Sequence, residues 1–286
     1  MSARLAFSVT KADGSKQLFE KEKVVQTAIR LGANPELALE LAQQVEGKLY
    51  EGITTRRILQ IIFALMGKRK PAVRHLFDLR RGLSLMAPKP EFEIFVRVLL
   101  SQIGFEVRPN TIMRGLCGEH EADAVVSKDG LTYFVEAKHH ANYHALTGLD
   151  ESRIARAIME DVAESYEHGV TTLKIDRAMI ITNTRYSEHA IQYGCCRGIL
   201  QIGWVSPDGF GLRDIVEKYK LYPLSCLRGI SLEVRMRLVD VGIVLIKQLR
   251  EQDIGYVERK TGLSHEAALA LMEKVKQTTE TLWLLE

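Results

Sequence analysis

Two carboxylates and a lysine stand close together in the segment EADAVVSKDGLTYFVEAKHH, residues 121–140. The pair Asp129-Gly130 is a strong signal for a two-residue turn, so the segment predicts a β-hairpin. In this register Asp123 faces Glu136, and Lys138 follows on the same face because side chains alternate along a strand. Like charges directly opposite each other destabilise a sheet, so we expect a counter-charge beside the two carboxylates.

A divalent cation or the Lys138 ammonium can supply that counter-charge. Carboxylate oxygens suit Mg²⁺ or Mn²⁺, and a lysine beside a metal-bound water can orient the water and stabilise developing negative charge. Together these groups suit metal-assisted hydrolysis of a phosphodiester. The alternative is a structural salt-bridge cluster on a solvated face, and the hairpin alone favours neither. Glu121 faces Lys138 in the same register, where it could tether the lysine or compete for the metal.

The sequence around the hairpin predicts an α/β domain, because helical and strand patterns alternate along it. A helix with apolar residues at helical spacing precedes the hairpin, and short apolar runs of the buried-strand type follow it. The expected elements besides the hairpin are helix 91–103, a strand from 105, helix 150–168, strand 177–183, helix 187–196 and strand 199–205.

Asp123 followed by Glu136-Ala137-Lys138 resembles the signature of the PD-(D/E)xK nucleases, in their Mrr-like restriction endonuclease branch. The helix PEFEIFVRVLLSQIGFEV and the later segment MIITNTRYSEHAIQYGCCRGILQIGWV are similar to that branch. The resemblance covers about residues 88–210 and implies a restriction-endonuclease-like core with a mixed sheet.

The resemblance also assigns expected roles to individual residues. It implies that Asp123 and Glu136 bind the metal and that Lys138 positions the attacking water. It implies that Glu93 supports the metal or a second water, with Glu91 as the nearest rival for this position. The expected activity is hydrolytic cleavage of DNA.

Four histidines, His120, His139, His140 and His144, flank the hairpin. Imidazoles placed there could contact DNA phosphates or bind a transition metal. We expect surface or supporting positions rather than metal ligation. The four cysteines form no CxxC pair, so the sequence indicates no zinc site.

The N-terminal part predicts a β-hairpin with its turn at Asp13-Gly14, followed by four helices. The helices are expected at 20–31, 35–49, from Thr54 or Thr55 to about 66, and at 71–82. The segments VTKADGSKQLFEKEKVVQTAI, YEGITTRRILQII and VRHLFDLRRG are similar to the ATP-cone domain, the nucleotide-binding regulatory module of ribonucleotide reductases. By this resemblance ATP or dATP is the regulatory ligand, and its expected contacts are Val9, Lys11, Lys23 and Thr55. No GxxxxGK[ST] motif occurs, so we expect ATP to be sensed rather than consumed.

Basic charge is concentrated in the N-terminal third. Residues 1–88 hold 15 Lys and Arg against 8 Asp and Glu, a net charge of +7, whereas residues 89–222 hold 15 against 19, a net charge of −4. A polyanionic partner is therefore most plausible for the first segment. A DNA contact by this basic domain, and a domain that has lost nucleotide binding, both stay open as alternatives.

The C-terminal part predicts helices and contains a weak repeat. Gly229-Ile230-Ser231 and Gly262-Leu263-Ser264 each precede a helix and resemble helix-hairpin-helix turns, which aim backbone amides at a DNA phosphate. Ser231 and Ser264 stand where such turns usually have a second glycine, and both can cap the following helix. The tail carries no net charge, so a protein contact or dimerisation role stays open.

The sequence thus predicts a multidomain α/β protein with an ATP-cone domain (1–87), a PD-(D/E)xK nuclease domain (88–222) and an all-helical tail (223–286). The expected function is a Mg²⁺-dependent (or Mn²⁺-dependent) DNA endonuclease regulated by ATP or dATP. A nucleotide-responsive DNA-binding regulator with a silent nuclease fold, and a purely structural interaction module, are the alternatives. Cutting both strands needs two sites, so we expect a homodimer or larger assembly. The chain has no apolar run of membrane-spanning length and no signal-peptide pattern, which favours a cytoplasmic protein without a membrane partner.

Overall fold

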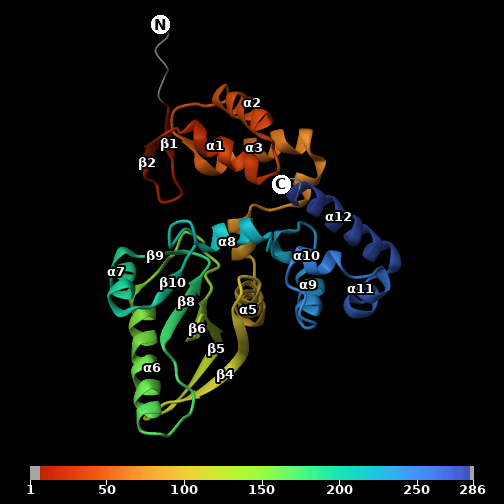
Figure 1. Cartoon of the computed structure of the whole chain (residues 1–286). Helices are drawn as coiled ribbons and strands as arrows, with labels where there is room; N and C mark the ends of the chain where they lie inside the picture. Colours follow the sequence, from red (N-terminus) through yellow and green to blue (C-terminus); the bar gives the residue numbers. More distant parts are fainter. Residues whose placement is uncertain (1–6, 284–286) are drawn as a thin grey trace. The chain divides into compact units, whose positions relative to one another are not determined.

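The computed structural model describes residues 7–283 and divides into two compact units (Figure 1). The first, unit 1, contains the described residues up to Phe77 together with 227–230 and the chain from Leu249 onwards. The second, unit 2, contains 78–226 and 231–248. The residues after 222 are thus shared between the two units. The division into three domains at 1–87, 88–222 and 223–286 stays a prediction.

Unit 2 is built on a five-stranded mixed sheet with the strand order β10-β8-β6-β5-β4. The antiparallel part joins β4, β5 and β6, and the parallel part joins β6, β8 and β10. The five strands are β4 (Glu106–Arg114), β5 (Glu119–Lys128), β6 (Leu131–Lys138), β8 (Arg177–Thr182) and β10 (Leu200–Ile202). This confirms the α/β class and the mixed sheet.

The predicted hairpin is formed by β5 and β6. Asp129 and Gly130 both have positive φ, 52° and 76°, as a tight two-residue turn between twisted strands requires. The register runs from Lys128↔Leu131 to Ala124↔Val135, as expected from the turn. Residues 122–126 are all buried, because the sheet is covered on both sides.

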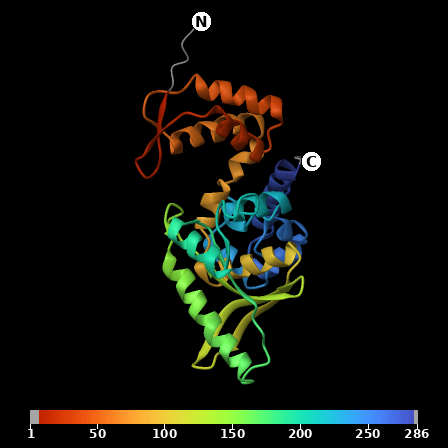
Figure 2. The ribbon, with the colours of Figure 1, turned by 60° about the vertical axis from the view of Figure 1, so that its left-hand side comes forward.

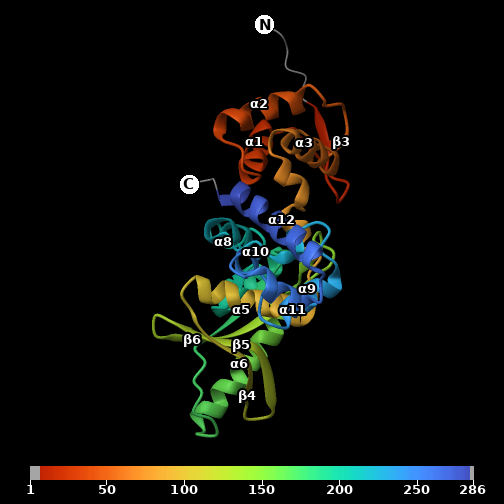
Figure 3. The ribbon, with the colours of Figure 1, turned by 90° about the vertical axis from the view of Figure 1, so that its right-hand side faces the viewer.

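Helices cover both faces of this sheet. Figure 3 shows α5 (Glu93–Gln102) and α6 (Leu149–Glu167) on opposite faces, and Figure 2 shows α6, in green, lying along the strands. The sheet residues Val125, Phe134 and Ile180 pack in one apolar cluster with residues of α6 and of α7 (Glu188–Arg197). Burying a side chain such as Phe134 contributes roughly 1.5–3 kcal/mol, so both strands of the hairpin are firmly anchored.

The remaining elements of unit 2 are short. Two short strands, β7 (Leu146–Thr147) after β6 and β9 (Arg185–Tyr186) after β8, pair in parallel as a separate two-stranded sheet. The helices are α4 (Leu79–Ser84), the π-helical turn η2 (Pro88–Phe92), α8 (Leu212–Tyr219), η3 (Leu224–Cys226) and α9 (Leu232–Val239). The expected helix 71–82 is instead two pieces, η1 (Pro71–His75) and α4. They are separated because Asp78 accepts a hydrogen bond from the Arg81 amide and so starts a new helix.

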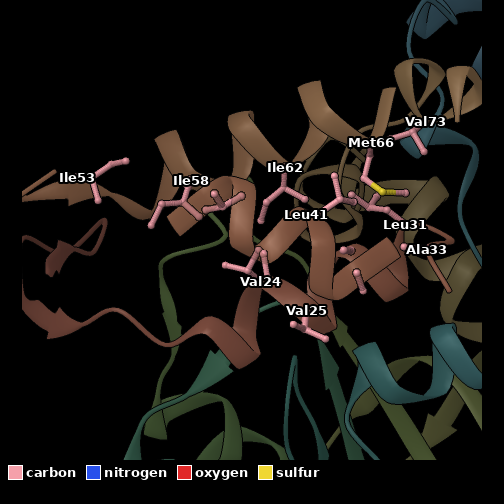
Figure 4. Packing of buried hydrophobic residues seen from close by; sticks show 14 of the residues in the cluster. Val24, Val25, Leu31, Ala33, Leu41, Ile53, Ile58, Ile62, Met66 and Val73 are labelled. Carbon is pink, nitrogen blue, oxygen red and sulfur yellow. The ribbon is translucent and has the colours of Figure 1, made fainter. Parts of the chain in front are cut away.

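Unit 1 combines a three-stranded sheet with helices around one apolar core. The sheet order is β2-β1-β3, formed by β1 (Ser8–Thr10), β2 (Lys16–Leu18) and β3 (Ile53–Thr54). Figure 4 shows the core, in which Val24, Leu41 and Ile62 meet between the helices. The helices other than η1 are α1 (Lys21–Arg30), α2 (Pro35–Glu46), α3 (Thr55–Arg69), α11 (Ile254–Thr261) and α12 (His265–Trp283); α10 (Ile246–Arg250) spans a unit boundary. Within the described part of the chain, no helix is both long and apolar enough to cross a membrane.

Candidate active site

The candidate catalytic residues come from three neighbouring elements of unit 2. Glu93 is the first residue of α5, Asp123 lies in the middle of β5, and Glu136 and Lys138 lie near the carboxyl end of β6. Glu93 is 7% exposed and Asp123 is 8% exposed, which is rare for acidic groups unless they are paired. The fold therefore removes two carboxylates from water at the place where the sequence predicts a metal.

The sheet opens at Asp123. The antiparallel ladder between β5 and β6 ends at Ala124↔Val135, and the amide of Ala137 donates instead to the Asp123 carboxylate, over 2.7 Å to Oδ2. On the other side, Asn110 has a positive φ of 40° and does not pair with Asp123. The Arg97 guanidinium fills this gap by donating to the Asp123 carbonyl (3.0 Å) and to Asn110 Oδ1 (2.5 Å). Asp123 is thus held by the sheet while its Oδ1 stays available.

Glu93 and Asp123 lie close enough to affect each other. Burial raises the pKa of Glu93, and the neighbouring Asp123 carboxylate raises it further, against the opposing effect of Lys89. The Lys89 Nζ lies 3.0 Å from Glu93 Oε1 and 4.0 Å from Asp123 Oδ1. The two acids therefore share one exposed lysine as their counter-charge.

Lys138 is held by two carboxylates. Its Nζ lies 2.8 Å from Glu136 Oε1 and 3.2 Å from Glu151 Oε2, which belongs to the first turn of α6. Burial alone would lower the pKa of Lys138, but the hydrogen bonds and charges of Glu136 and Glu151 outweigh it, so the pKa is raised. The pKa of Glu136 is also raised, in this case because burial disfavours the charged carboxylate. Glu121, expected to face Lys138, is exposed and forms no ion pair with it in the described structure.

The residues present fit a divalent metal in their chemistry, although their arrangement is not that of a closed site. Among the described residues, no group of three or more His, Cys, Asp or Glu side chains is arranged to hold a metal ion. The donors on offer are carboxylate oxygens, which Mg²⁺ and Mn²⁺ prefer. The buried Glu93 carboxylate beside Asp123 has the Lys89 ammonium at 3.0 Å as its counter-charge, and the Lys89 side chain is 70% exposed, so a metal ion can take the place of this ammonium. Asp123, Glu136 and Glu93 are the residues that would hold such an ion.

Glu91, the rival of Glu93, has a different environment. Its side chain is fully buried, its Oε2 accepts from the Ala87 amide (2.8 Å), and its Oε1 lies 2.8 Å from Arg235 Nε of α9. Arg235 also donates to the Leu85 carbonyl. This buried ion pair joins α9 to the start of the nuclease-like segment, so Glu91 is engaged in the packing of unit 2.

Two residues of this cluster were missed in the sequence analysis, Lys89 and Glu151. Lys89 lies four residues before Glu93 and reaches it across the π-helical turn η2, a geometry that sequence periodicity does not reveal. Glu151 carried a usable signal. It lies in the first turn of the helix that follows the Glu-x-Lys strand, and that turn starts near the end of the strand bearing the lysine.

The histidines take up positions in the surrounding structure. His120 Nε2 lies 2.7 Å from Asp161 Oδ2, and the main chain of His140 exchanges two hydrogen bonds with the Asn183 side chain. His139 Nε2 donates to the Leu83 carbonyl (2.9 Å), and its ring packs against Phe92. Their contacts agree with the supporting positions expected for them.

His139 leads to a prediction about pH. Burial lowers the pKa of His139, and its Nδ1 is buried without an acceptor, so protonation would place an unpaired N–H in the core. A histidine with a lowered folded-state pKa contributes stability that is present above its unfolded-state pKa and is lost as pH falls through the folded value. We expect the free energy of unfolding to fall between about pH 7 and pH 5. The His139→Gln variant should lose less over the same interval in urea unfolding; parallel curves for the two proteins would contradict this.

The expected nucleotide contacts are distributed over β1, α1 and the start of α3 in unit 1. Val9 is buried in β1 and pairs with Ile53, and Thr10 pairs with Thr54 in parallel. Lys11 and Thr55 therefore follow side by side at the ends of two neighbouring strands. Lys23, by contrast, is paired with Glu20 at 2.7 Å on the surface. Lys11 and Thr55 thus follow the last residue pair of β1 and β3, whereas Lys23 forms a local ion pair.

Comparisons with known proteins agree with this architecture. Residues 85–199 match the family model Mrr_cat, described as "Restriction endonuclease". An uncharacterized protein of Archaeoglobus fulgidus is 36% identical over 179 residues, which cover 63% of this chain and 97% of that protein. The crystal structure of a protein of unknown function, AF1548, is similar with a TM-score of 0.58 and 34% identity, covering 66% of this chain and 96% of the other.

Fold and family match together define a protein with a restriction-endonuclease-like catalytic domain, so the nuclease-type core expected from the sequence is confirmed. The chain belongs to the same family as the Archaeoglobus fulgidus protein, and its residues 85–199 form the Mrr_cat domain.

Proposed function

We propose that this protein is a metal-dependent DNA endonuclease that hydrolyses phosphodiester bonds with Asp123, Glu136, Lys138 and Glu93. The observation that carries the proposal is the packing of three carboxylates and the half-buried Lys138 ammonium at the opening of a restriction-endonuclease-like sheet. A solvated salt-bridge cluster, the structural alternative, is disfavoured because Asp123 and Glu93 are buried. Such pKa shifts in buried groups gather at functional sites.

In the proposed reaction, the oxygen of a water molecule forms a new bond to phosphorus as the water loses a proton, and the P–O bond to one sugar oxygen breaks. That leaving oxygen takes up a proton and becomes the hydroxyl of one strand end, and the other strand end keeps the phosphate. A divalent ion bound by Asp123 and Glu136 would polarise the phosphate and lower the pKa of the attacking water. Lys138 remains protonated because of Glu136 and Glu151, so its ammonium can orient the water and stabilise negative charge on the phosphate. Glu93 is the group placed to accept a proton or hold a second water.

The direct test is a cleavage assay with supercoiled and linear DNA in the presence of Mg²⁺, Mn²⁺ or EDTA. We expect cleavage with either metal and none in EDTA. Asp123→Asn should lower the rate at least roughly 100-fold, because losing a charged ligand typically costs several kcal/mol of transition-state stabilisation. Asp129→Asn, in the hairpin turn, is the matched control and should keep the wild-type rate. DNA binding without any cleavage would instead favour the alternative, a regulator with a silent nuclease fold.

We further propose that unit 1 contains an ATP-cone-like domain in which ATP or dATP regulates the nuclease. The supporting observations are the hairpin followed by helices and the parallel pairing of β1 with β3, after which Lys11 and Thr55 are the next residues of the two strands. A lysine and a hydroxyl at neighbouring strand ends can contact phosphate groups. The basic excess of residues 1–88 is the reason that a DNA contact by this domain stays the rival explanation.

Nucleotide binding can be tested by calorimetry and thermal unfolding. We expect ATP to raise the melting temperature, since a ligand present at 100 times its Kd stabilises the folded state by about 2.7 kcal/mol. Lys11→Ala should abolish most of this shift, and Lys16→Ala, an exposed lysine of β2, should not. A shift that is unchanged in Lys11→Ala would contradict the assignment of the site.

The C-terminal tail contains two serine-capped helices. Ser231 and Ser264 cap α9 and α12, accepting from the amides of Val234 and Ala267. These caps occupy amides that a helix-hairpin-helix turn would offer to DNA, so we propose contact with protein or a second copy as the tail's first role. A homodimer would place two sites on one duplex, and light scattering with and without ATP measures it.

A further inference from the structure

Unit 2 carries a second group of residues that the proposed chemistry does not use. Arg80, Tyr143, Arg185 and Trp204 come from four separate segments, and three of them follow the carboxyl ends of parallel strands. Tyr143 follows β6, Arg185 follows β8 and Trp204 follows β10. Ligands of open α/β sheets bind at this edge because the loops there converge. Lys138 ends β6, so the group and the candidate catalytic lysine share one edge of the sheet.

Backbone hydrogen bonds hold these loops against one another. The Trp204 amide donates to the Thr184 carbonyl over 2.8 Å, which places the main chain of Trp204 next to the residue that precedes Arg185. Arg185 pairs in turn with Leu146 in the small β7–β9 ladder, and this draws in the loop that carries Tyr143. The arrangement is therefore built into the fold.

Arg80 joins the group from α4. Its NH2 group donates to the Tyr143 carbonyl (2.7 Å), and its guanidinium carbon lies 5.3 Å from the Tyr143 ring centroid and 5.7 Å from that of Trp204. The Arg80 Nε is buried and has no hydrogen-bond acceptor. A purely structural arginine would normally satisfy this donor.

The two arginines bring positive charge together without a bound carboxylate. Burial lowers the pKa of Arg80, and the charge of Arg185 lowers it further, while Tyr143 and Asp78 act in the opposite direction. Within the described part of the chain, neither guanidinium forms an ion pair with an acidic side chain. Arg185 is exposed, so its side chain is free to meet an anion from solution.

We propose that Arg80, Arg185, Tyr143 and Trp204 form a binding site for one strand of the nucleic-acid substrate. Arg185, supported by Arg80, contacts a backbone phosphate, and an aromatic ring of Trp204 or Tyr143 stacks on the adjacent base. Arginine recognises phosphate through its planar fork of donors, and base–aromatic stacking is the usual means of holding an unpaired base. This inference rests on the proposed function for the identity of the ligand. The same chemistry, a phosphate ester beside a base, is also found in free ATP.

Binding measured in EDTA tests the site separately from cleavage. With full-length protein and a fluorescein-labelled oligonucleotide, Arg185→Gln should weaken single-strand binding roughly 10-fold and lower the slope of log K against log salt by about one. The control is Arg177→Gln, an exposed arginine at the opposite end of β8, roughly 20 Å away along the strand. It should change the affinity less than about twofold. Equal effects of the two substitutions, or none from Arg185→Gln, would overturn the proposal.

Trp204 fluorescence identifies the ligand. The chain has two tryptophans, so the Trp283→Phe variant leaves Trp204 as its only one. We expect the oligonucleotide to quench this emission in a saturable way that Arg185→Gln weakens. Quenching by ATP alone with the same dependence on Arg185 would assign the site to free nucleotide and overturn the strand assignment. If the protein binds DNA through Arg185 but fails to cleave it in the presence of any metal ion, this site would be supported and the proposed nuclease activity would be refuted.

Discussion

Substituting methionine for Lys138 is expected to lower the rate of metal-dependent DNA cleavage roughly 10²–10⁴-fold, the range observed when a positioned catalytic group is removed. Methionine keeps an unbranched side chain of similar length, so the packing of β6 should persist. The lost group is the ammonium held at 2.8 Å from Glu136 and 3.2 Å from Glu151. The effect should appear in kcat rather than in KM, because Lys138 acts on the attacking water and the developing charge.

The matched control is Lys174→Met, a lysine paired with Asp176 on the surface of the same unit. It should cleave at the wild-type rate. Glu151→Gln should fall between the two, since Glu151 positions Lys138 without touching the substrate, and it should move the pH profile of kcat. A wild-type cleavage rate in Lys138→Met would remove the lysine from the mechanism and point to a contaminating nuclease or a different site.

Replacing Arg235 with leucine is expected to cost roughly 3–5 kcal/mol of folding free energy, because Glu91 would remain buried without its partner. Glu91 is fully buried and lies 2.8 Å from Arg235 Nε. For a unit of this size such a loss lowers the melting temperature by roughly 6–20 °C. Thermal unfolding followed by circular dichroism measures it, with urea unfolding as the check on the free energy.

The double variant Glu91→Leu/Arg235→Leu separates loss of the pair from loss of shape. It should recover most of the stability, since replacing a buried ion pair by apolar residues is often neutral or better. Glu160→Ala, which removes the surface partner of Arg156, is the control and should stay within about 1 kcal/mol of the wild type. A single Arg235→Leu variant that is as stable as this control would show that the pair does not hold α9 in place.

The local sequence determined the hairpin and its register. Asp129-Gly130 allows the two positive φ angles of a tight turn, and the period of two then decides which side chains share a face. The alternation of helical and strand patterns between residues 91 and 210 was likewise sufficient for the α/β class. These features depend on neighbours in the chain, so the sequence contains the information directly.

The tertiary structure alone decided which charges meet. The resemblance names Glu93 first and Glu91 as its rival, and the different surroundings of these two residues depend on how the π-helical turn η2 enters α5 and on Arg235, far along the chain. The partner of Lys138 is Glu151 rather than Glu121, because the β5–β6 ladder ends at Ala124 and α6 delivers its first turn there. Contacts between distant segments depend on packing, and strand periodicity carries no information about them.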